Sequence, residues 1–221
     1  MRQFRFWWFG LGNLTLVVVA VLAVLQLATS GGAMQALAQD RGSGPVLSME
    51  IKGPIGVATE IYFEEVLQEA RARKASLVVV ALDTPGGLVT STRKIIQMIL
   101  ASEVPVAVYV SPSGAHAASA GTYIVYAAHI AVMAPGTNIG AATPIQLGGI
   151  PGLPGTPEPA LGDPGKPAVP QAADAKAVND AVAFLKSLAQ LRGRNAQWAE
   201  EAVRSAATLT AQDALREQVI D

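Results

Sequence analysis

The stretch GAHAASAGTYI, residues 114–124, places Ser119 among glycines and alanines. Small neighbours let the backbone of a peptide approach a nucleophile, and the N–H group of the following residue can stabilise an oxyanion. His116, three residues earlier, is the nearest side chain that could take the hydroxyl proton. For an isolated Ser-Ala-Gly sequence, close packing of helices through small residues is the competing interpretation.

A second candidate is LDTPGG, residues 82–87, which follows a run of β-branched residues typical of a buried strand. Open α/β sheets bind ligands at the carboxyl ends of their strands. Because Gly86 and Gly87 carry no side chain, their N–H groups could face a ligand. A tight turn before a helix explains the same residues. Asp83 could be the acid of a catalytic triad or could fix the turn.

Hydrophobic periodicity predicts the elements that position these motifs. Strands are expected within residues 42–52, 76–83, 104–111 and 129–134. Helices are expected from residue 59, over residues 88–102, from about residue 117, from residue 174 and over residues 195–206. Asn195 is expected to cap the last of these, and Thr210 with Asp213 forms a capping box for a final short helix. The closing Val-Ile-Asp, residues 219–221, is predicted to start a strand.

Alternation of strands and helices predicts an α/β fold built from βαβ units, with parallel strands buried between helices. The helix over residues 88–102 is expected to bury Leu88, Ile95, Ile96 and Ile99. His129 is expected to lie in a turn before a strand.

The amino-terminal segment has the pattern of a secretory signal peptide. Arg2 and Arg5 precede an apolar run from Leu14 to Leu25, and Ala36-Leu37-Ala38 provides a small-x-small cleavage site. Residues 1–38 are therefore expected to be a signal peptide, with an uncleaved signal anchor as the alternative. In both cases the remainder, residues 39–221, is expected to be exported and to form one domain.

Composition excludes several classes of function. The formal net charge is −1, so no nucleic-acid partner is expected. The absence of cysteine excludes disulfides, thiol catalysis and cysteine-based zinc sites. No metal and no cofactor are expected.

Residues 143–173 are rich in proline and glycine and have no periodicity. Two interpretations stay open: a flap over a cleft, or a solvated insertion without a role.

Taken together, LDTPGG, GAHAASAGTYI and MAPGTNIGAATPI, in this order, resemble the membrane-associated serine proteases of the NfeD (stomatin-operon) type. The resemblance extends from Val46 to the end of the chain. It implies the Clp-protease/crotonase-like fold of repeated ββα and βαβ units.

The same resemblance implies a Ser/Lys dyad, with Ser119 as nucleophile and Lys176 as base. Lys176 is identified by counting back from KSLAQLRGRN, which is similar to the family's helix, and Lys166 is the rival base. A lysine can act as a base only when it is neutral, and an apolar pocket favours that state.

The neighbours Ala175, Ala177 and Val178 suit partial burial of Lys176. The sequence alone favours a solvated lysine in the first turn of a helix, and only the resemblance favours the catalytic role. The family pattern gives His116 no role.

The resemblance also implies an oxyanion hole formed by the N–H groups of Gly87 and Ala120. The peptide substrate would bind beside Gly86 and Gly87 as an added strand. With no histidine to orient, Asp83 is expected to fix the turn through its own backbone.

The expected function is an exported serine endopeptidase that cleaves apolar peptide segments, with stomatin-like membrane proteins as candidate substrates. Proximity to a membrane and a homo-oligomer, a dimer or larger, are expected from the family. The alternatives are a non-catalytic peptide- or stomatin-binding scaffold and a signal-peptide-peptidase-like enzyme. An acyl-CoA enzyme of the crotonase type would give Ser119 and Lys176 no evident task.

Overall fold

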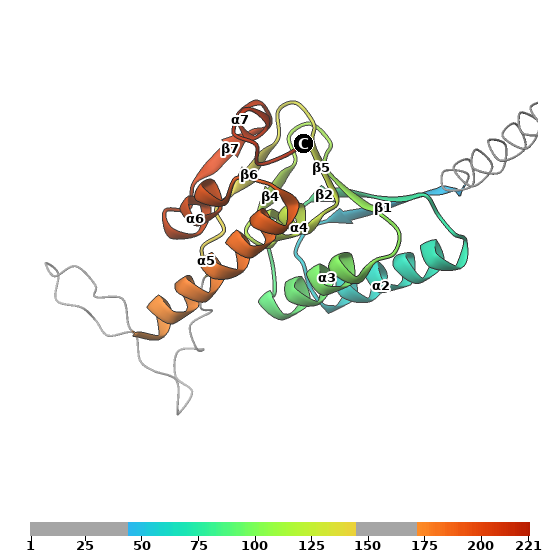
Figure 1. The fold of residues 1–221 in the computed structure, drawn as a ribbon, viewed down its shortest axis with the longest axis horizontal. Helices are drawn as coiled ribbons and strands as arrows, with labels where there is room; N and C mark the ends of the chain where they lie inside the picture. The colour runs from blue at the N-terminus through green and yellow to red at the C-terminus, as the bar shows by residue number, and fades with distance from the viewer. Residues whose placement is uncertain (1–43, 145–171) are drawn as a thin grey trace, which may run out of the picture. The chain divides into compact units, whose positions relative to one another are not determined.

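Four parallel strands form the main sheet of the computed structural model, which describes residues 44–144 and 172–221 (Figure 1). The order across the sheet is β1 (Val46–Lys52), β2 (Leu77–Asp83), β3 (Val106–Val110) and β5 (Ile130–Met133). The inner strands carry the β-branched runs, and Val78, Val80 and Val108 are fully buried. The predicted α/β class and parallel pairing are confirmed.

Helices α2 (Val57–Ala72) and α3 (Val89–Ala101) lie side by side along the main sheet (Figure 1). On α3, Ile95, Ile96 and Ile99 are fully buried, as their spacing predicts. The expected burial of Leu88 is wrong: 46% of this residue is exposed. Leu88 is the N-cap residue and has an extended backbone, so it does not share the buried face of the helix.

A second, three-stranded sheet was not predicted. It consists of β4 (His116–Ala118), β6 (Asn138–Gly140) and β7 (Thr208–Thr210), in that order. Strands β4 and β6 are parallel, whereas β6 and β7 are antiparallel. Three residues are too few to show an alternating pattern, so these strands were invisible in the sequence.

The remaining helices are α4 (Ala120–Ala127), α5 (Ala172–Arg192), α6 (Ala196–Arg204) and α7 (Ala211–Arg216). Both predicted caps are confirmed. The Asn195 side chain accepts a hydrogen bond from the Trp198 N–H group at 2.9 Å, and Thr210 accepts one from Asp213 at 3.3 Å. Residues 219–221 form no strand, contrary to expectation, although the Asp221 N–H group donates to the Ala131 carbonyl at 2.9 Å.

The leader, residues 1–38, and Lys166, together with nearly all of the Pro/Gly-rich loop at 143–173, lie outside the described residues. Within residues 44–144 and 172–221, no helix combines the length and the apolar character needed to cross a bilayer. The described residues from Pro45 onwards belong to one compact unit.

Candidate functional site

Ser119 lies between β4 and α4 in a strained backbone conformation, with φ 49° and ψ −111°. Its N–H group donates to the Gly140 carbonyl at 3.0 Å, and the half-buried side chain makes no hydrogen bond to another described residue. Non-glycine residues at positive φ are uncommon and concentrate at functional sites. The conformation turns the chain sharply from strand to helix at the candidate nucleophile.

The small residues after Ser119 also have a packing role. A side chain on Gly121 would place its Cβ atom 2.7 Å from the Thr84 methyl group and 3.2 Å from the Ala117 Cβ atom. Close packing therefore explains Gly121, whereas it does not explain the hydroxyl group or the strained backbone at Ser119. The packing interpretation of the Ser-Ala-Gly sequence therefore holds for Gly121, and Ser119 stays the candidate nucleophile.

Gly86 and Gly87 form the facing turn. A Cβ atom on Gly86, which has φ 119°, would lie 2.8 Å from the Ser119 Cβ atom. A Cβ atom on Gly87 would lie 2.1 Å from the Ile55 carbonyl oxygen. The Ile55 N–H group donates to the Gly86 carbonyl at 2.8 Å, and the Ile55 carbonyl accepts from the Leu88 N–H group at 2.9 Å. The Gly87 N–H group takes no part in these two hydrogen bonds.

The side chain of Thr84, which is fully buried, stabilises this turn. Its hydroxyl oxygen lies 3.1 Å from both the N–H nitrogen and the carbonyl oxygen of Gly86. Ala120 is the first residue of α4, and its N–H group therefore precedes the helical hydrogen-bond ladder. The structure thus brings Gly86, Gly87, Ser119 and Ala120 together, as the sequence predicts.

A cavity of about 240 Å³ opens beside these residues. Its wall is mainly apolar and is built from α3, α4, α5 and the segment after β6. The lining residues are Gly87, Val89, Thr92, Arg93, Ser119, Ala120, Tyr123, Ala142, Pro144, Ala177, Asp180, Ala181 and Phe184. A cavity of this character suits apolar side chains of a ligand.

Two stacked aromatic rings, one from α4 and one from α5, line one side of the cavity. The rings of Tyr123 and Phe184 stack with centroids 6.0 Å apart, and the Tyr123 hydroxyl group donates to the Ala142 carbonyl at 3.1 Å. Burial raises the pKa of Tyr123 to about 12, so this phenol stays protonated at neutral pH. Tyr123 therefore acts as a wall and a hydrogen-bond donor, not as a general base.

Lys176 does not have the partly buried environment that its assignment as the base of the dyad predicted. It lies near the start of α5 and is exposed, and Ala177, not Lys176, lines the cavity. Among the side chains of α5 that the structure describes, the buried ones begin only at Ala181. Lys176 precedes Asp180, a lining residue, by one helical turn, so it lies at the rim of the cavity on the same side of the helix.

His116 pairs with Asp83, a contact that the sequence did not reveal. The Asp83 Oδ1 atom lies 3.1 Å from both the backbone nitrogen and the ring Nδ1 of His116. The expectation that Asp83 fixes its own turn is wrong, because this carboxylate instead links the end of β2 to β4. His116 is not among the residues that line the cavity, and no hydrogen bond joins it to Ser119.

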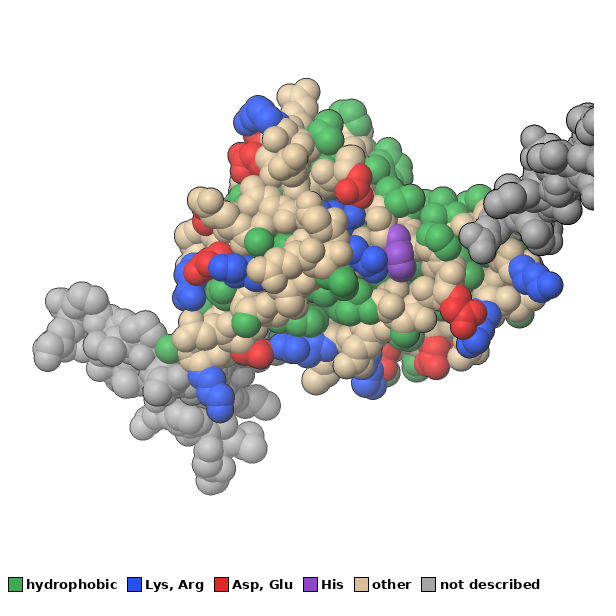
Figure 2. Space-filling model, in the orientation of Figure 1, with side chains coloured by type: hydrophobic (Ala, Val, Ile, Leu, Met, Phe, Trp, Pro, Cys, Tyr) green, Lys and Arg blue, Asp and Glu red, His purple; other side chains and the backbone are tan. Residues whose placement is uncertain are grey.

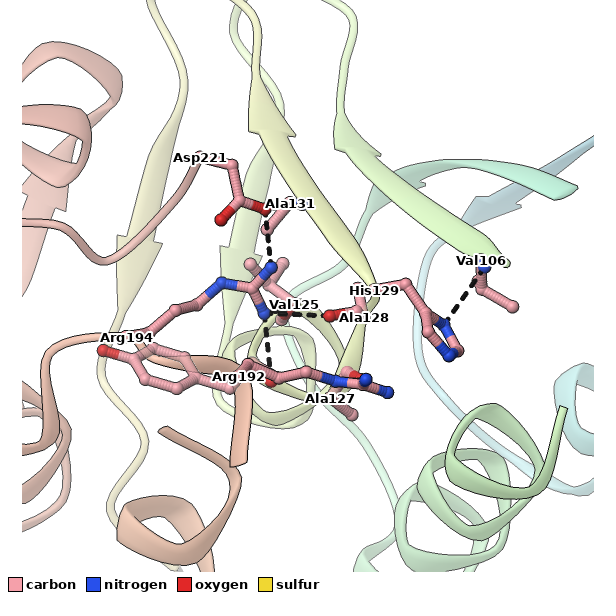
Figure 3. A network of polar contacts seen from close by, with 10 residues as sticks. Val106, Val125, Ala127, Ala128, His129, Ala131, Arg192, Arg194 and Asp221 are labelled. Carbon is pink, nitrogen blue, oxygen red and sulfur yellow. Dashed lines mark hydrogen bonds and ion pairs between the residues drawn. The ribbon is translucent and has the colours of Figure 1, made fainter. Parts of the chain in front are cut away.

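The carboxyl end of α4 is held by two arginines that the sequence did not single out (Figure 3). The buried Arg194 donates to the carbonyls of Val125, Tyr126 and Ala128 at 3.0–3.1 Å. Arg192 donates to the Ala127 carbonyl at 2.9 Å. Cations at a helix carboxyl terminus stabilise the helix, here the one that follows Ser119.

His129 is part of the same region and has a structural role. Its Nδ1 atom accepts a hydrogen bond from the Val106 N–H group at 3.2 Å (Figure 3). Partial burial lowers the pKa of His129, and the nearby charges of Arg192 and Arg194 lower it further. The prediction that His129 precedes a strand is confirmed, since β5 starts at Ile130.

The distribution of charged side chains and possible metal ligands does not point to a further site among the described residues. Acidic and basic side chains are interspersed on the face shown in Figure 2. Among the described residues, no group of histidines and carboxylates is arranged to hold a metal ion.

The chain is similar in sequence to a family model and to two membrane proteins, one of which is described as a protease. Residues 45–151 match the family model described as NfeD1b, N-terminal domain. The chain is 40% identical over 172 residues to the membrane-bound protease PH1510 of Pyrococcus horikoshii, covering 78% of this chain and 35% of that protein. It is 34% identical over 123 residues to the membrane protein NfeD1b of Bacillus subtilis, covering 56% of this chain and 27% of that protein. It thus spans about a third or less of these relatives' length.

Solved structures of the 1510-N membrane-bound stomatin-specific protease are also similar. A serine-to-alanine mutant superimposes with a TM-score of 0.68 at 38% identity, covering 80% of this chain and 78% of that one. A lysine-to-alanine mutant in complex with a substrate peptide gives a TM-score of 0.67 at 39% identity, covering 80% and 74%.

Proposed function

Because the chain belongs to the NfeD N-terminal-domain family and has the Clp-protease/crotonase-like fold of 1510-N, we propose that it is a serine endopeptidase. Ser119 is the nucleophile and Lys176 the base in this proposal. The observation that carries it is the strained Ser119 at an apolar cavity, directly against Gly86 and beside Gly87.

In the proposed reaction, an extended peptide lies beside Gly86 and Gly87 and places an apolar side chain in the cavity. Ser119 attacks the scissile carbonyl while Lys176 takes the hydroxyl proton and later gives it to the leaving amine. The N–H groups of Gly87 and Ala120 stabilise the oxyanion. Lys176 must be neutral for this role, and an apolar peptide laid across the rim would exclude water around it.

The substrate class follows from the named activity of the relative. The 1510-N protease is described as specific for stomatin and has been solved with a substrate peptide. We therefore propose an apolar segment of a stomatin-like membrane protein as the substrate. The proposal includes action outside the cytoplasm, near a membrane and as a homo-oligomer, as the sequence predicts.

The exposure of Lys176 favours one alternative, a scaffold that binds the same peptide without cleaving it. Lys176 is exposed beside the cavity and makes no hydrogen bond to another described residue. It is therefore less well placed to take the Ser119 hydroxyl proton than a base inside the cavity would be. The scaffold requires the cavity and the turn at Gly86 and Gly87 but needs no proton transfer.

The test is cleavage of apolar peptides, including segments of a stomatin-like protein, followed by mass spectrometry. The variants are Ser119→Ala, Lys176→Ala and Lys166→Ala, with Lys186→Ala as a control on the same helix that instead pairs with Glu200 at 2.7 Å. We expect the Ser119 and Lys176 variants to lose about a thousandfold or more in kcat, with the other two active.

Two other outcomes would each redirect the assignment. Loss of cleavage in Lys166→Ala, with Lys176→Ala active, would make Lys166 the base. Peptide binding without cleavage by any form, including the unmodified chain, would establish the scaffold.

A further inference from the structure

Arg93 spans the cavity wall from α3 to α5 and contacts α5 at two successive turns. Its guanidinium group forms an ion pair with the Asp180 carboxylate and lies 4.3 Å from the centre of the Phe184 ring. Phe184 in turn stacks on Tyr123 of α4. All four residues line the cavity, so the contacts join three helices around it.

These contacts fall directly after the turn that carries Lys176. Asp180 is four residues beyond Lys176 and Phe184 four beyond Asp180, so the three follow one another along one side of α5. Residues 174–176, 179 and 180 are exposed. The polar contacts of this segment with the rest of the described domain are the Arg93–Asp180 pair and a 3.2 Å hydrogen bond from Arg204 to Asn179.

An exposed ion pair alone would be weak evidence that Arg93 holds α5, since such pairs contribute little to stability. Arg93 differs because the same guanidinium group also lies on an aromatic face, where a cation–π contact adds to the ion pair. Its side chain is 39% exposed, whereas that of Asp180 is 69% exposed. The arginine is thus the fixed partner, held against the ring, and the aspartate on α5 is held by it.

We propose that Arg93 is a positioning residue that holds the amino-terminal part of α5 across the cavity, so that Lys176 stays within reach of Ser119. The catalytic consequence rests on the proposed function. Arg93 acts through Asp180 and Phe184 and does not touch the reacting atoms. It sets the distance between nucleophile and base, a quantity to which rate is sensitive.

The experiment compares Arg93→Met, which keeps an aliphatic stem, with Asp180→Asn and with the charge swap Arg93→Asp/Asp180→Arg. Arg71→Met is the matched control, because Arg71 forms an equally direct ion pair, with Glu103 at 2.7 Å, and does not line the cavity. Two quantities are measured on the whole chain: amide hydrogen exchange of residues 174–184, and kcat and KM for a peptide whose cleavage requires Ser119.

We expect exchange in residues 174–184 to accelerate about tenfold in Arg93→Met and in Asp180→Asn, and to be unchanged in Arg71→Met. In the first two variants kcat should fall about tenfold while KM stays within about twofold. The charge swap should restore part of the exchange protection and part of kcat, which loss of folding could not explain.

Exchange and kcat in Arg93→Met equal to those of Arg71→Met would overturn the proposal. So would a raised KM with unchanged exchange and kcat, because Arg93 would then contact the peptide itself. If no form cleaves any peptide, the proposed function fails, while the exchange comparison still decides whether Arg93 positions α5.

Discussion

The Asp83 carboxylate binds both the backbone N–H group and the ring of His116, with its Oδ1 atom 3.1 Å from each nitrogen. Asp83 ends β2 and His116 starts β4. The two strands lead to the glycine turn and to Ser119, respectively, and the Thr84 N–H group bonds the His116 carbonyl at 2.8 Å alongside. The pair therefore joins the two halves of the candidate site, and the ring faces Asp83.

Replacing Asp83 with alanine should be more damaging than replacing His116. Asp83→Ala removes the acceptor of a backbone N–H group in a partly buried position, so we expect the free energy of unfolding to fall by about 1–3 kcal/mol. His116→Ala keeps the backbone bond and should cost less than about 1 kcal/mol. Urea denaturation of both variants measures the difference.

The same pair of variants tests the role of His116 in cleavage. We expect His116→Ala to retain Ser119-dependent cleavage, because the imidazole points to Asp83 and not into the cavity. Loss of cleavage in a His116→Ala chain that is still folded would identify a Ser/His pair and contradict the Ser/Lys assignment.

A second prediction concerns the strain at Ser119, which has φ 49°. Such a conformation costs a non-glycine residue about 1–3 kcal/mol, whereas glycine adds about 0.5–1 kcal/mol of backbone entropy to be lost on folding. We therefore expect the free energy of unfolding of Ser119→Gly to exceed that of Ser119→Ala by about 1 kcal/mol. Urea denaturation of both variants measures this difference. Both variants should be inactive.

Ser187, within α5 and exposed, provides the control for that comparison. There the backbone is helical, so glycine should be less stable than alanine by about 1 kcal/mol. The same ranking of glycine and alanine at both serines would contradict stored strain at Ser119.

The sequence predicted the main sheet and the motifs at its edge because their signals are local. Buried parallel strands appear as β-branched runs, and the caps at Asn195 and Thr210 depend on residues three positions apart. Gly86 and Ser119 belong to short motifs whose residues act together. Such features can be predicted without knowing which distant segments of the chain lie in contact.

The contacts that hold the site could not be predicted, because each joins segments far apart in the chain. Asp83 and His116 are separated by 33 residues, and Arg93 and Asp180 by 87. The expectation that Lys176 is partly buried, which the resemblance favoured over a solvated lysine, was wrong for a related reason. Its alanine neighbours suggested burial, but burial depends on how far the start of α5 extends beyond the helices it packs against.

A third prediction follows from the neutral state of His129. Its Nδ1 atom must be unprotonated to accept the Val106 N–H group, and burial lowers the pKa of the ring. An unfolded chain binds the proton at a higher pH, near the ordinary value of about 6.5. Below that value the unfolded state holds more protons, so stability should fall as the pH falls towards the lowered pKa.

His129→Asn keeps an acceptor that does not titrate and therefore serves as the comparison. Urea denaturation at about pH 7.5 and at about pH 5.5, on either side of the ordinary histidine pKa, should show a smaller loss of stability in the variant. An equal loss in both proteins would show that His129 does not contribute to the pH dependence.

The last prediction concerns Arg194, whose side chain is 3% exposed. Besides three carbonyls at the end of α4, it binds the Asp221 carboxylate at 2.7 Å, and that carboxylate also accepts the Ala131 N–H group at 2.8 Å (Figure 3). Arg194→Met leaves the three carbonyls without their buried donor, whereas the Asp221 side chain, which is 48% exposed, can be solvated by water. We expect the free energy of unfolding to fall by about 1.5–3 kcal/mol.

Arg192→Met is the control, since Arg192 donates to only one carbonyl of the same helix end and should cost about 1 kcal/mol. Arg194→Lys should recover only part of the loss, because an ammonium group cannot reproduce the planar guanidinium geometry. A loss in Arg194→Met no larger than in Arg192→Met would mean that water satisfies the carbonyls. If the prediction holds, α4 is anchored by its carboxyl end, and Ser119 owes its fixed position partly to an arginine at the opposite end of the helix.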